Sequence, residues 1–99
     1  MDRFEACTRV KETIAYIIAY APDAFPFRDY CAPDEQIDLD RAYSELRAEF
    51  GELSKAVKDD VQIAQCLQGI EESYQHYKAG DMKAGILKIQ EVLHAVMKM

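Results

Sequence analysis

The chain has 99 residues, of which 49% are hydrophobic and 30% charged, and its formal net charge is −6. This composition is typical of one soluble globular domain covering residues 1–99, because the apolar residues suffice to offset the entropy lost on folding. The acidic balance argues against a nucleic-acid-binding protein and against a basic module that binds membrane surfaces.

The sequence contains no recognisable export signal, because Asp2 and Glu5 lie where such a signal carries positive charge. The most apolar run, residues 14–21, is too short to span a bilayer. The chain has three cysteines, an odd number, and they form no CxxC motif: Cys7, Cys31 and Cys66. We therefore expect three reduced thiols and a cytoplasmic location.

The first predicted helix covers about residues 2–20 and ends at Pro22, which cannot continue a helix. Its apolar residues recur at three- and four-residue steps, which is typical of one buried helix face. These residues are Phe4, Cys7, Val10, Ile14, Ile17, Ile18 and Ala21.

Residues 22–37 are predicted to form a long loop, because three prolines interrupt them. A short helical turn inside this loop is compatible with that spacing. Connections of this length are uncommon in compact bundles and often carry function.

The second helix is predicted to begin near Asp34 or Asp38, since either residue can cap a helix N-terminus. Its apolar face consists of Leu39, Ala42, Tyr43, Leu46, Phe50, Leu53 and Val57. Gly51 inside this helix predicts a bend or a close contact with another helix.

Two further helices are predicted, with a break at residues 58–60 before the third and a Gly80-Asp81 turn between them. The short turn makes these last two helices antiparallel. With no strand-like alternation elsewhere, the predicted fold is an all-α bundle of four main helices. The expected faces are Ile63, Ala64, Leu67, Ile70, Tyr74 and Tyr77, then Met82, Gly85, Ile86, Ile89, Leu93, Val96 and Met97.

Residues 77–93 resemble the turn and second helix of a tetratricopeptide repeat. The resemblance consists of the Tyr-x-x-Gly-Asp run that begins at Tyr77 and of the small residue Gly85. Upstream the pattern departs, because Gly69, Glu72 and Ser73 occupy positions where the repeat has other residues. The resemblance implies a helical hairpin at residues 61–99, and any tight hairpin with a Gly-Asp cap has the same local pattern.

The sequence contains no complete catalytic, metal-binding or phosphate-binding motif. Glu91 and His94 have the Glu-x-x-His spacing of carboxylate-bridged di-iron bundles, but the other histidine, His76, follows Glu72 by four residues. No sequence pattern activates a cysteine or serine, and no glycine-rich loop is present to bind phosphate. We therefore predict a protein that is not an enzyme and that has no catalytic, cofactor-binding or metal-binding residues.

Acidic residues concentrate in residues 23–60, which contain eleven acidic and five basic residues. On a helical projection of residues 38–58, Asp38, Glu45, Glu49 and Glu52 lie on one flank of the apolar stripe, and Arg47 lies on the other. Folding alone gives no reason to gather like charges, because they repel one another. The alternative is an ordinary solvated helix face.

The predicted loop adds Phe25, Phe27 and Tyr30, with Asp34 and Glu35 close by. Aromatic residues surrounded by polar groups are typical of binding hot spots. The alternative is that these rings cover the open end of the bundle.

In size, helicity and charge the chain resembles the small acidic helical immunity proteins of bacterial toxin systems. The resemblance implies an immunity protein or antitoxin that is monomeric when free and covers the basic active site of a nuclease toxin. The alternative is a helical adaptor or self-associating subunit that uses the hairpin at residues 61–99. The predicted partner-binding residues are Phe25, Phe27, Tyr30, Asp34, Glu35, Asp38, Glu45, Glu49 and Glu52.

Overall fold

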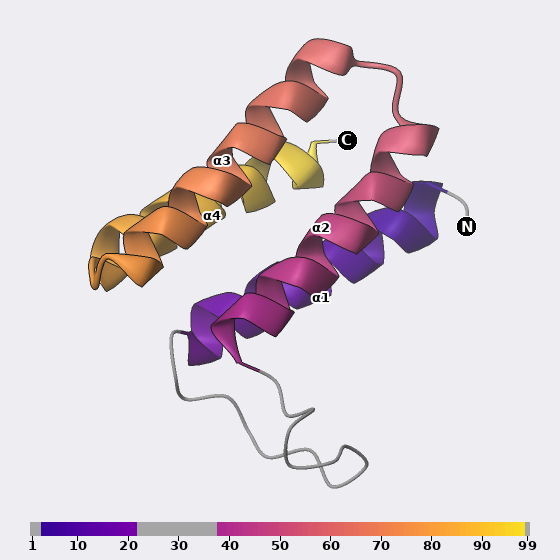
Figure 1. Cartoon of the computed structure of the whole chain (residues 1–99). Helices are drawn as coiled ribbons and strands as arrows, with labels where there is room; N and C mark the ends of the chain where they lie inside the picture. The colour runs from indigo at the N-terminus through magenta and orange to yellow at the C-terminus, as the bar shows by residue number, and fades with distance from the viewer. Residues whose placement is uncertain (1–2, 22–37, 99) are drawn as a thin grey trace, which may run out of the picture.

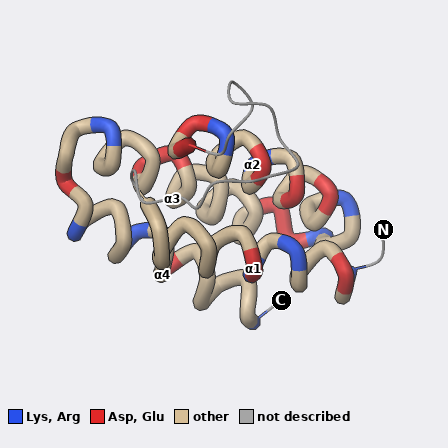
Figure 2. Tube along the Cα trace, turned by 90° about the horizontal axis from the view of Figure 1, so that it is seen from below, with Lys and Arg blue, Asp and Glu red and all other residues tan. Residues whose placement is uncertain are grey.

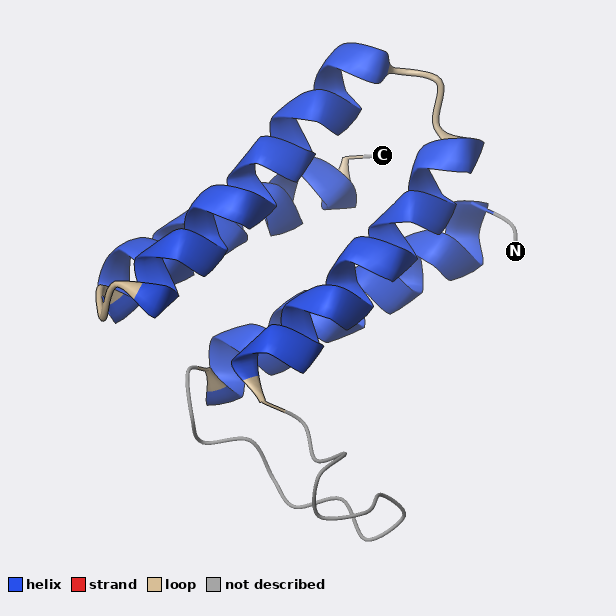
Figure 3. Ribbon diagram, viewed as in Figure 1, coloured by secondary structure: helices blue, strands red, loops and turns tan. Residues whose placement is uncertain are grey.

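The computed structural model describes residues 3–21 and 38–98, which form four α-helices and no strand (Figures 1 and 3). The helices are α1 (Arg3–Tyr20), α2 (Leu39–Ala56), α3 (Asp60–Lys78) and α4 (Met82–Met97). The predicted all-α bundle of four helices is confirmed. The predicted loop at residues 22–37, with any short turn inside it, lies outside the described residues.

Three of the four helices begin after an aspartate whose side chain caps the helix. The Asp38, Asp59 and Asp81 carboxylates accept hydrogen bonds from the backbone N–H three residues later, at 2.8, 3.0 and 3.1 Å. Each such cap satisfies an amide that has no partner within the helix and stabilises the fold by about 1 kcal/mol. Of the two caps predicted for the second helix, Asp38 is the one used.

The turn between α3 and α4 ends α3 in a Schellman motif. Gly80 has a φ of 84°, in the left-handed region that favours glycine. Its N–H donates to the Tyr77 carbonyl at 3.1 Å, and the Asp81 N–H donates to the His76 carbonyl at 2.8 Å. The Gly-Asp pair therefore ends one helix and caps the next, which sets α3 and α4 antiparallel.

The helices form two hairpins, α1–α2 and α3–α4, which pack on each other (Figures 1 and 2). Helices α1 and α4 approach closely, whereas α2 and α3 have few backbone contacts and are joined by long side chains. The largest fully buried side chains among the described residues come from α1 and α2, and they are Tyr43, Phe50, Ile14, Ile17, Leu46 and Leu53. None of the helices in the described ranges combines the length and apolar character needed to span a bilayer.

The predicted buried face of α2 is confirmed at every position, but the ends of α1 and α4 differ from the prediction. Phe4 is 82% exposed, Met82 50% and Met97 63%, although all three belong to the predicted apolar stripes. Each lies in a terminal turn of its helix.

The buried face of α3 is rotated from the predicted one. Cys66 and Ser73 are buried, whereas Ala64 is exposed and Leu67 is 42% exposed. The rotation follows from packing, because α3 makes most of its contacts with α4 rather than with α2. The predicted close helix contact at Gly51 is wrong, since a Cβ there would meet no atom within 4 Å.

A buried hydrogen-bond chain connects α2, α3 and α4 through Ser73. The Ser73 Oγ–H donates to the Gly85 carbonyl at 2.7 Å, and Ser73 Oγ lies 2.6 Å from Tyr43 Oη. Because the single serine proton goes to Gly85, the Tyr43 hydroxyl must donate to Ser73. The chain satisfies two buried hydroxyls and fixes the position of the α2 tyrosine over α3.

Candidate functional site

Three of the acidic residues lie together on the outer surface where α1 packs against α2. Glu45 and Glu49 come from α2 and Glu12 from α1, and we call these three residues the acidic cluster. Glu49 is half-buried, and its carboxylate accepts a hydrogen bond from the Thr13 hydroxyl of α1. This bond joins α1 to α2 and holds the Glu49 carboxylate against α1, at the residue next to Glu12.

The environment of Glu49 disfavours its ionised form. Burial raises the pKa of the Glu49 carboxyl, and the charges of Glu45 and Glu12 raise it further. The Thr13 hydrogen bond and the charge of Arg9 act in the opposite direction but do not cancel the rise in pKa. At neutral pH the cluster therefore holds negative charge at a cost to folding, and a nearby cationic group would reduce that cost.

The four predicted helical site residues have different surroundings. Glu45 is exposed and Glu49 half-buried, and both belong to the acidic cluster. Glu52 forms an ion pair with Lys55 at 3.1 Å on its own helix, and Asp38 caps α2. The structure thus brings two of the four together. The remaining predicted residues, Phe25, Phe27, Tyr30, Asp34 and Glu35, lie outside the described residues.

Sequence reasoning missed Glu12 and Thr13 as members of this surface. Both belong to α1, and only the alignment of α1 with α2 places them beside Glu49. The sequence signal available was the position of Glu12 next to the apolar stripe of α1. A helical projection of one segment alone does not give the register between two helices.

On the other side of α2 the charges are paired across to α3. Arg47 Nε donates to Glu71 at 2.6 Å, and Lys78 Nζ lies 3.4 Å from Asp40. A hydrogen bond from the Tyr74 hydroxyl, together with Lys78, lowers the pKa of Asp40. Each of these two α2 charges therefore has a charged partner on α3, in contrast to the like charges of the acidic cluster.

The described residues are less acidic than the whole chain. They contain thirteen acidic and eleven basic side chains, a net charge of −2, and both kinds occur along the helices (Figure 2). The remaining net charge of −4 belongs to residues 1–2, 22–37 and 99. The acidic cluster is thus a local concentration on an otherwise nearly balanced set of helices.

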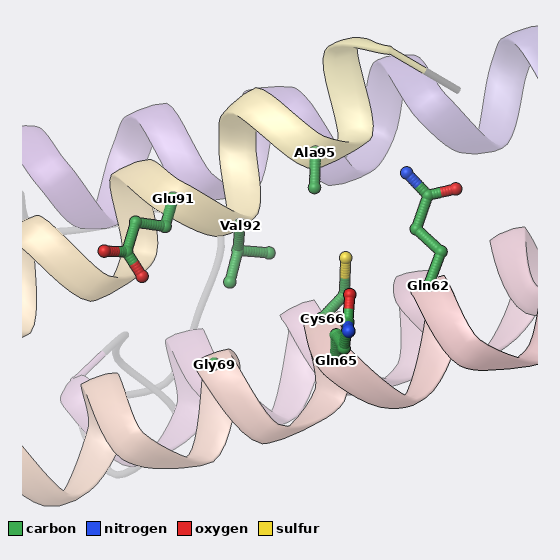
Figure 4. Close-up of a pocket in the computed structure, with 7 residues that line it drawn as sticks. All are labelled: Gln62, Gln65, Cys66, Gly69, Glu91, Val92 and Ala95. Carbon is green, nitrogen blue, oxygen red and sulfur yellow. The ribbon is translucent and has the colours of Figure 1, made fainter.

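A pocket of about 230 Å³ lies between α3 and α4 (Figure 4). Gly69 of α3 allows the close approach of Val92, because a Cβ there would lie 2.7 Å from Val92 Cγ2. The Cys66 thiol points into the space between the helices, is 3% exposed, and has a pKa that burial raises. A raised pKa disfavours the reactive thiolate. The lining residues are Gln62, Gln65, Cys66, Gly69, Glu91, Val92 and Ala95.

The Glu91–His94 pair does not gain further metal-ligating partners. Both side chains are exposed, and Glu91 lies 3.7 Å from Lys88. Over residues 3–21 and 38–98, no group of three or more histidine, cysteine, aspartate or glutamate side chains is arranged to hold a metal ion.

Replacing Glu49 with glutamine is expected to stabilise the protein at pH 7 by about 0.5 kcal/mol. The unfolded chain ionises this carboxyl near 4.5, and the folded protein ionises it at higher pH. The folded state therefore binds more protons in this interval, and stability falls as pH rises through the folded pKa. Urea unfolding should show the gain from Glu49→Gln at pH 7 and its decline toward pH 4.5.

The matched control is Glu52→Gln, one turn further along α2. Glu52 has a cationic partner in Lys55, so its replacement should leave stability unchanged or slightly lower at pH 7. A Glu49→Gln gain that does not vary with pH, or a loss at pH 7, would contradict the account of the cluster.

No protein-family model, curated protein or solved structure matches the chain. A function for this protein is therefore argued from its own residues and their geometry.

Proposed function

We propose that the chain is a small acidic protein-binding module that docks a basic protein on the acidic cluster. In its most concrete form it is an immunity protein or antitoxin that covers the basic active site of a nuclease toxin. A nuclease site is cationic because it binds phosphate, so an acidic protein surface complements it.

The observation that carries this proposal is the meeting of three carboxylates, those of Glu12, Glu45 and the half-buried Glu49, on one surface of α1 and α2. Burial together with Glu45 and Glu12 raises the pKa of Glu49, so the charged cluster destabilises the folded chain. Charges that reduce stability are a recurrent property of functional surfaces. A lysine or arginine from a partner would restore a favourable environment for the same carboxylate and convert that cost into binding energy.

The paired charges on the opposite side of α2 support this assignment by contrast. There the fold places Arg47 against Glu71 and Lys78 near Asp40, which shows that α2 acids and bases can be matched within the chain. On the α1 side, Arg9 lowers the pKa of Glu49, whereas the charges of Glu45 and Glu12 raise it. A lysine or arginine of a partner would add positive charge to this surface.

The test measures association with a basic nuclease domain, the partner that this proposal requires. The double reversal Glu45→Lys with Glu49→Lys should slow association about tenfold at low salt and weaken its salt dependence. The control reversal, Asp60→Lys with Glu91→Lys, changes the net charge equally at exposed positions of α3 and α4, the hairpin that does not carry the cluster. It should slow association much less.

Two results would overturn the proposal. One is an association rate that the cluster reversal leaves within twofold of the wild type, with the fold checked by circular dichroism. The other is an equal loss in the control variant, which would assign binding to overall charge rather than to the cluster.

A second candidate function is a helical adaptor or self-associating subunit built on the α3–α4 hairpin. It is favoured by the large apolar side chains that this hairpin leaves exposed, Leu67, Met82 and Leu87. Sedimentation equilibrium separates the two candidates, because this one requires a stable homodimer and the acidic module requires a monomer when free.

A further inference from the structure

A shallow groove of about 390 Å³ lies between the first turns of α1 and the last turn of α4. Cys7 and Val96 are buried in it, with exposed fractions of 9% and 1%. We call this site the terminal groove, and the residues that line it are Arg3, Phe4, Cys7, Lys11, Val96 and Met97.

The walls of the terminal groove are two large apolar side chains left in water. Phe4 on α1 and Met97 on α4 are the exposed apolar members of the lining, whereas Cys7 and Val96 are buried. Apolar surface in water is unfavourable by about 25 cal/mol per Å², so a ligand that covers both side chains gains free energy. Exposed methionine and phenylalanine beside a buried apolar floor are typical of surfaces that receive a partner's side chains.

The rim of the terminal groove is basic, although the chain as a whole is acidic. Among the described residues, Arg3 and Lys11 are the charged lining residues, and none of the described lining residues is acidic. Within the described residues no ion pair joins Lys11 to a carboxylate. The α1 acids lie elsewhere, since Glu12 belongs to the acidic cluster and Glu5 lies 3.7 Å from Arg9.

We propose that the terminal groove binds an amphipathic helix of a partner protein in which glutamate or aspartate flanks the apolar residues. The walls come from two neighbouring helices, as in other grooves that receive a third helix. The basic rim selects acidic flanks by charge complementarity. The site goes beyond the proposed function, because it takes an anionic partner at a place distinct from the acidic cluster.

The charge of the rim disfavours a second copy of this chain as the occupant. In a two-fold symmetric contact the same patch faces itself, so Arg3 and Lys11 of one copy would meet those of the other. The exposure of Phe4 disfavours a small anionic amphiphile, because ligand pockets enclose most of a small ligand.

The experiment follows the methionine methyl groups of the full chain by NMR during titration with two synthetic helical peptides. Both peptides carry the same leucine and alanine stripe, flanked by glutamate in one and by lysine in the other. The glutamate peptide should shift the Met97 methyl signal and leave Met82 unchanged. It should bind about tenfold more tightly than the lysine peptide at low salt.

Variants of the groove supply matched controls. Lys11→Glu should reverse the preference between the two peptides, and Met97→Gln should weaken glutamate-peptide binding about tenfold. Met82→Gln replaces another exposed methionine of α4, outside the groove, and should change neither result.

Four outcomes would overturn the inference. These are no shift at Met97 with either peptide, equal affinity for both peptides, tighter binding of dodecanoate than of the glutamate peptide, and a homodimer that Met97→Gln dissociates. Since Met97 and Met82 are exposed and Lys11 is half-buried, the variants are not expected to disturb folding, and circular dichroism verifies this.

Discussion

Replacing Ser73 with alanine is expected to destabilise the fold by about 2–3 kcal/mol. Ser73 is fully buried, and its hydroxyl both accepts from Tyr43 and donates to the Gly85 carbonyl. Alanine removes both bonds and leaves the Tyr43 hydroxyl buried without its acceptor. The penalty for a buried unpaired hydroxyl exceeds the net value of the bond itself.

A double-mutant cycle with Tyr43→Phe separates this penalty from lost packing. Phenylalanine keeps the ring but removes the hydroxyl that Ser73→Ala would orphan. The double variant should therefore lose less stability than the sum of the single variants, by about 1 kcal/mol. Urea unfolding of the four proteins measures this coupling. Additive losses would mean that the two hydroxyls do not act as one chain.

The buried serine also shows why the face of α3 was predicted only in part. Local rules placed the ends of the helices well, because Asp38, Asp59, Asp81 and Gly80 act within one turn of their own sequence. A serine in the core breaks the apolar pattern, and its burial depends on a hydroxyl from α2 and a carbonyl from α4. These partners are distant in sequence, so a projection of α3 alone favours Leu67 over Ser73.

The acidic cluster, like the buried face of α3, could be predicted from the sequence only in part. The flank of α2 that carries Glu45 and Glu49 follows from helical periodicity within one segment. Its meeting with Glu12 depends on the register between α1 and α2, which the Thr13–Glu49 bond now defines. The terminal groove was not predictable, because periodicity assigns Phe4 to the core, whereas the structure leaves its side chain 82% exposed beside Met97.

The two proposed surfaces give α1 opposite charges on two different faces. Glu12 faces the α2 side within the acidic cluster, and Lys11, its neighbour in sequence, faces α4 at the terminal groove. Consecutive residues on a helix point about 100° apart, so one helix can serve both surfaces without mixing their charges. A basic partner and an acidic helix could therefore occupy the chain together.

Replacing Gly85 with alanine is expected to destabilise the fold by about 1–2 kcal/mol, even though alanine favours helices. A Cβ at this position would lie 2.8 Å from Tyr77 Cδ2 and 2.9 Å from Cε2. Tyr77 is only 4% exposed and packs edge-on against Tyr43, with ring centroids 6.3 Å apart. The ring therefore cannot move away without disturbing the core. Thermal and urea unfolding measure the loss.

Gly51→Ala is the matched control, because it makes the same chemical change inside a helix with no atom within 4 Å of the new Cβ. There the helix propensity of alanine acts alone, and stability should rise by up to about 1 kcal/mol. A loss of stability in Gly85→Ala together with a gain in Gly51→Ala would show that the loss comes from the contact with Tyr77. Equal gains would show that α3 and α4 can separate at Gly85, which contradicts the tight hairpin.

Tyr77→Phe tests the contact between Gly85 and Tyr77 by changing the tyrosine instead of the glycine. Within the described residues the buried Tyr77 hydroxyl has no hydrogen-bond partner, so its removal should leave stability unchanged or raise it slightly. Because the phenylalanine ring occupies the same space, Gly85→Ala should cost as much in the Tyr77→Phe background as in the wild type. A smaller loss in that background would attribute the cost to the hydroxyl rather than to the ring against Gly85.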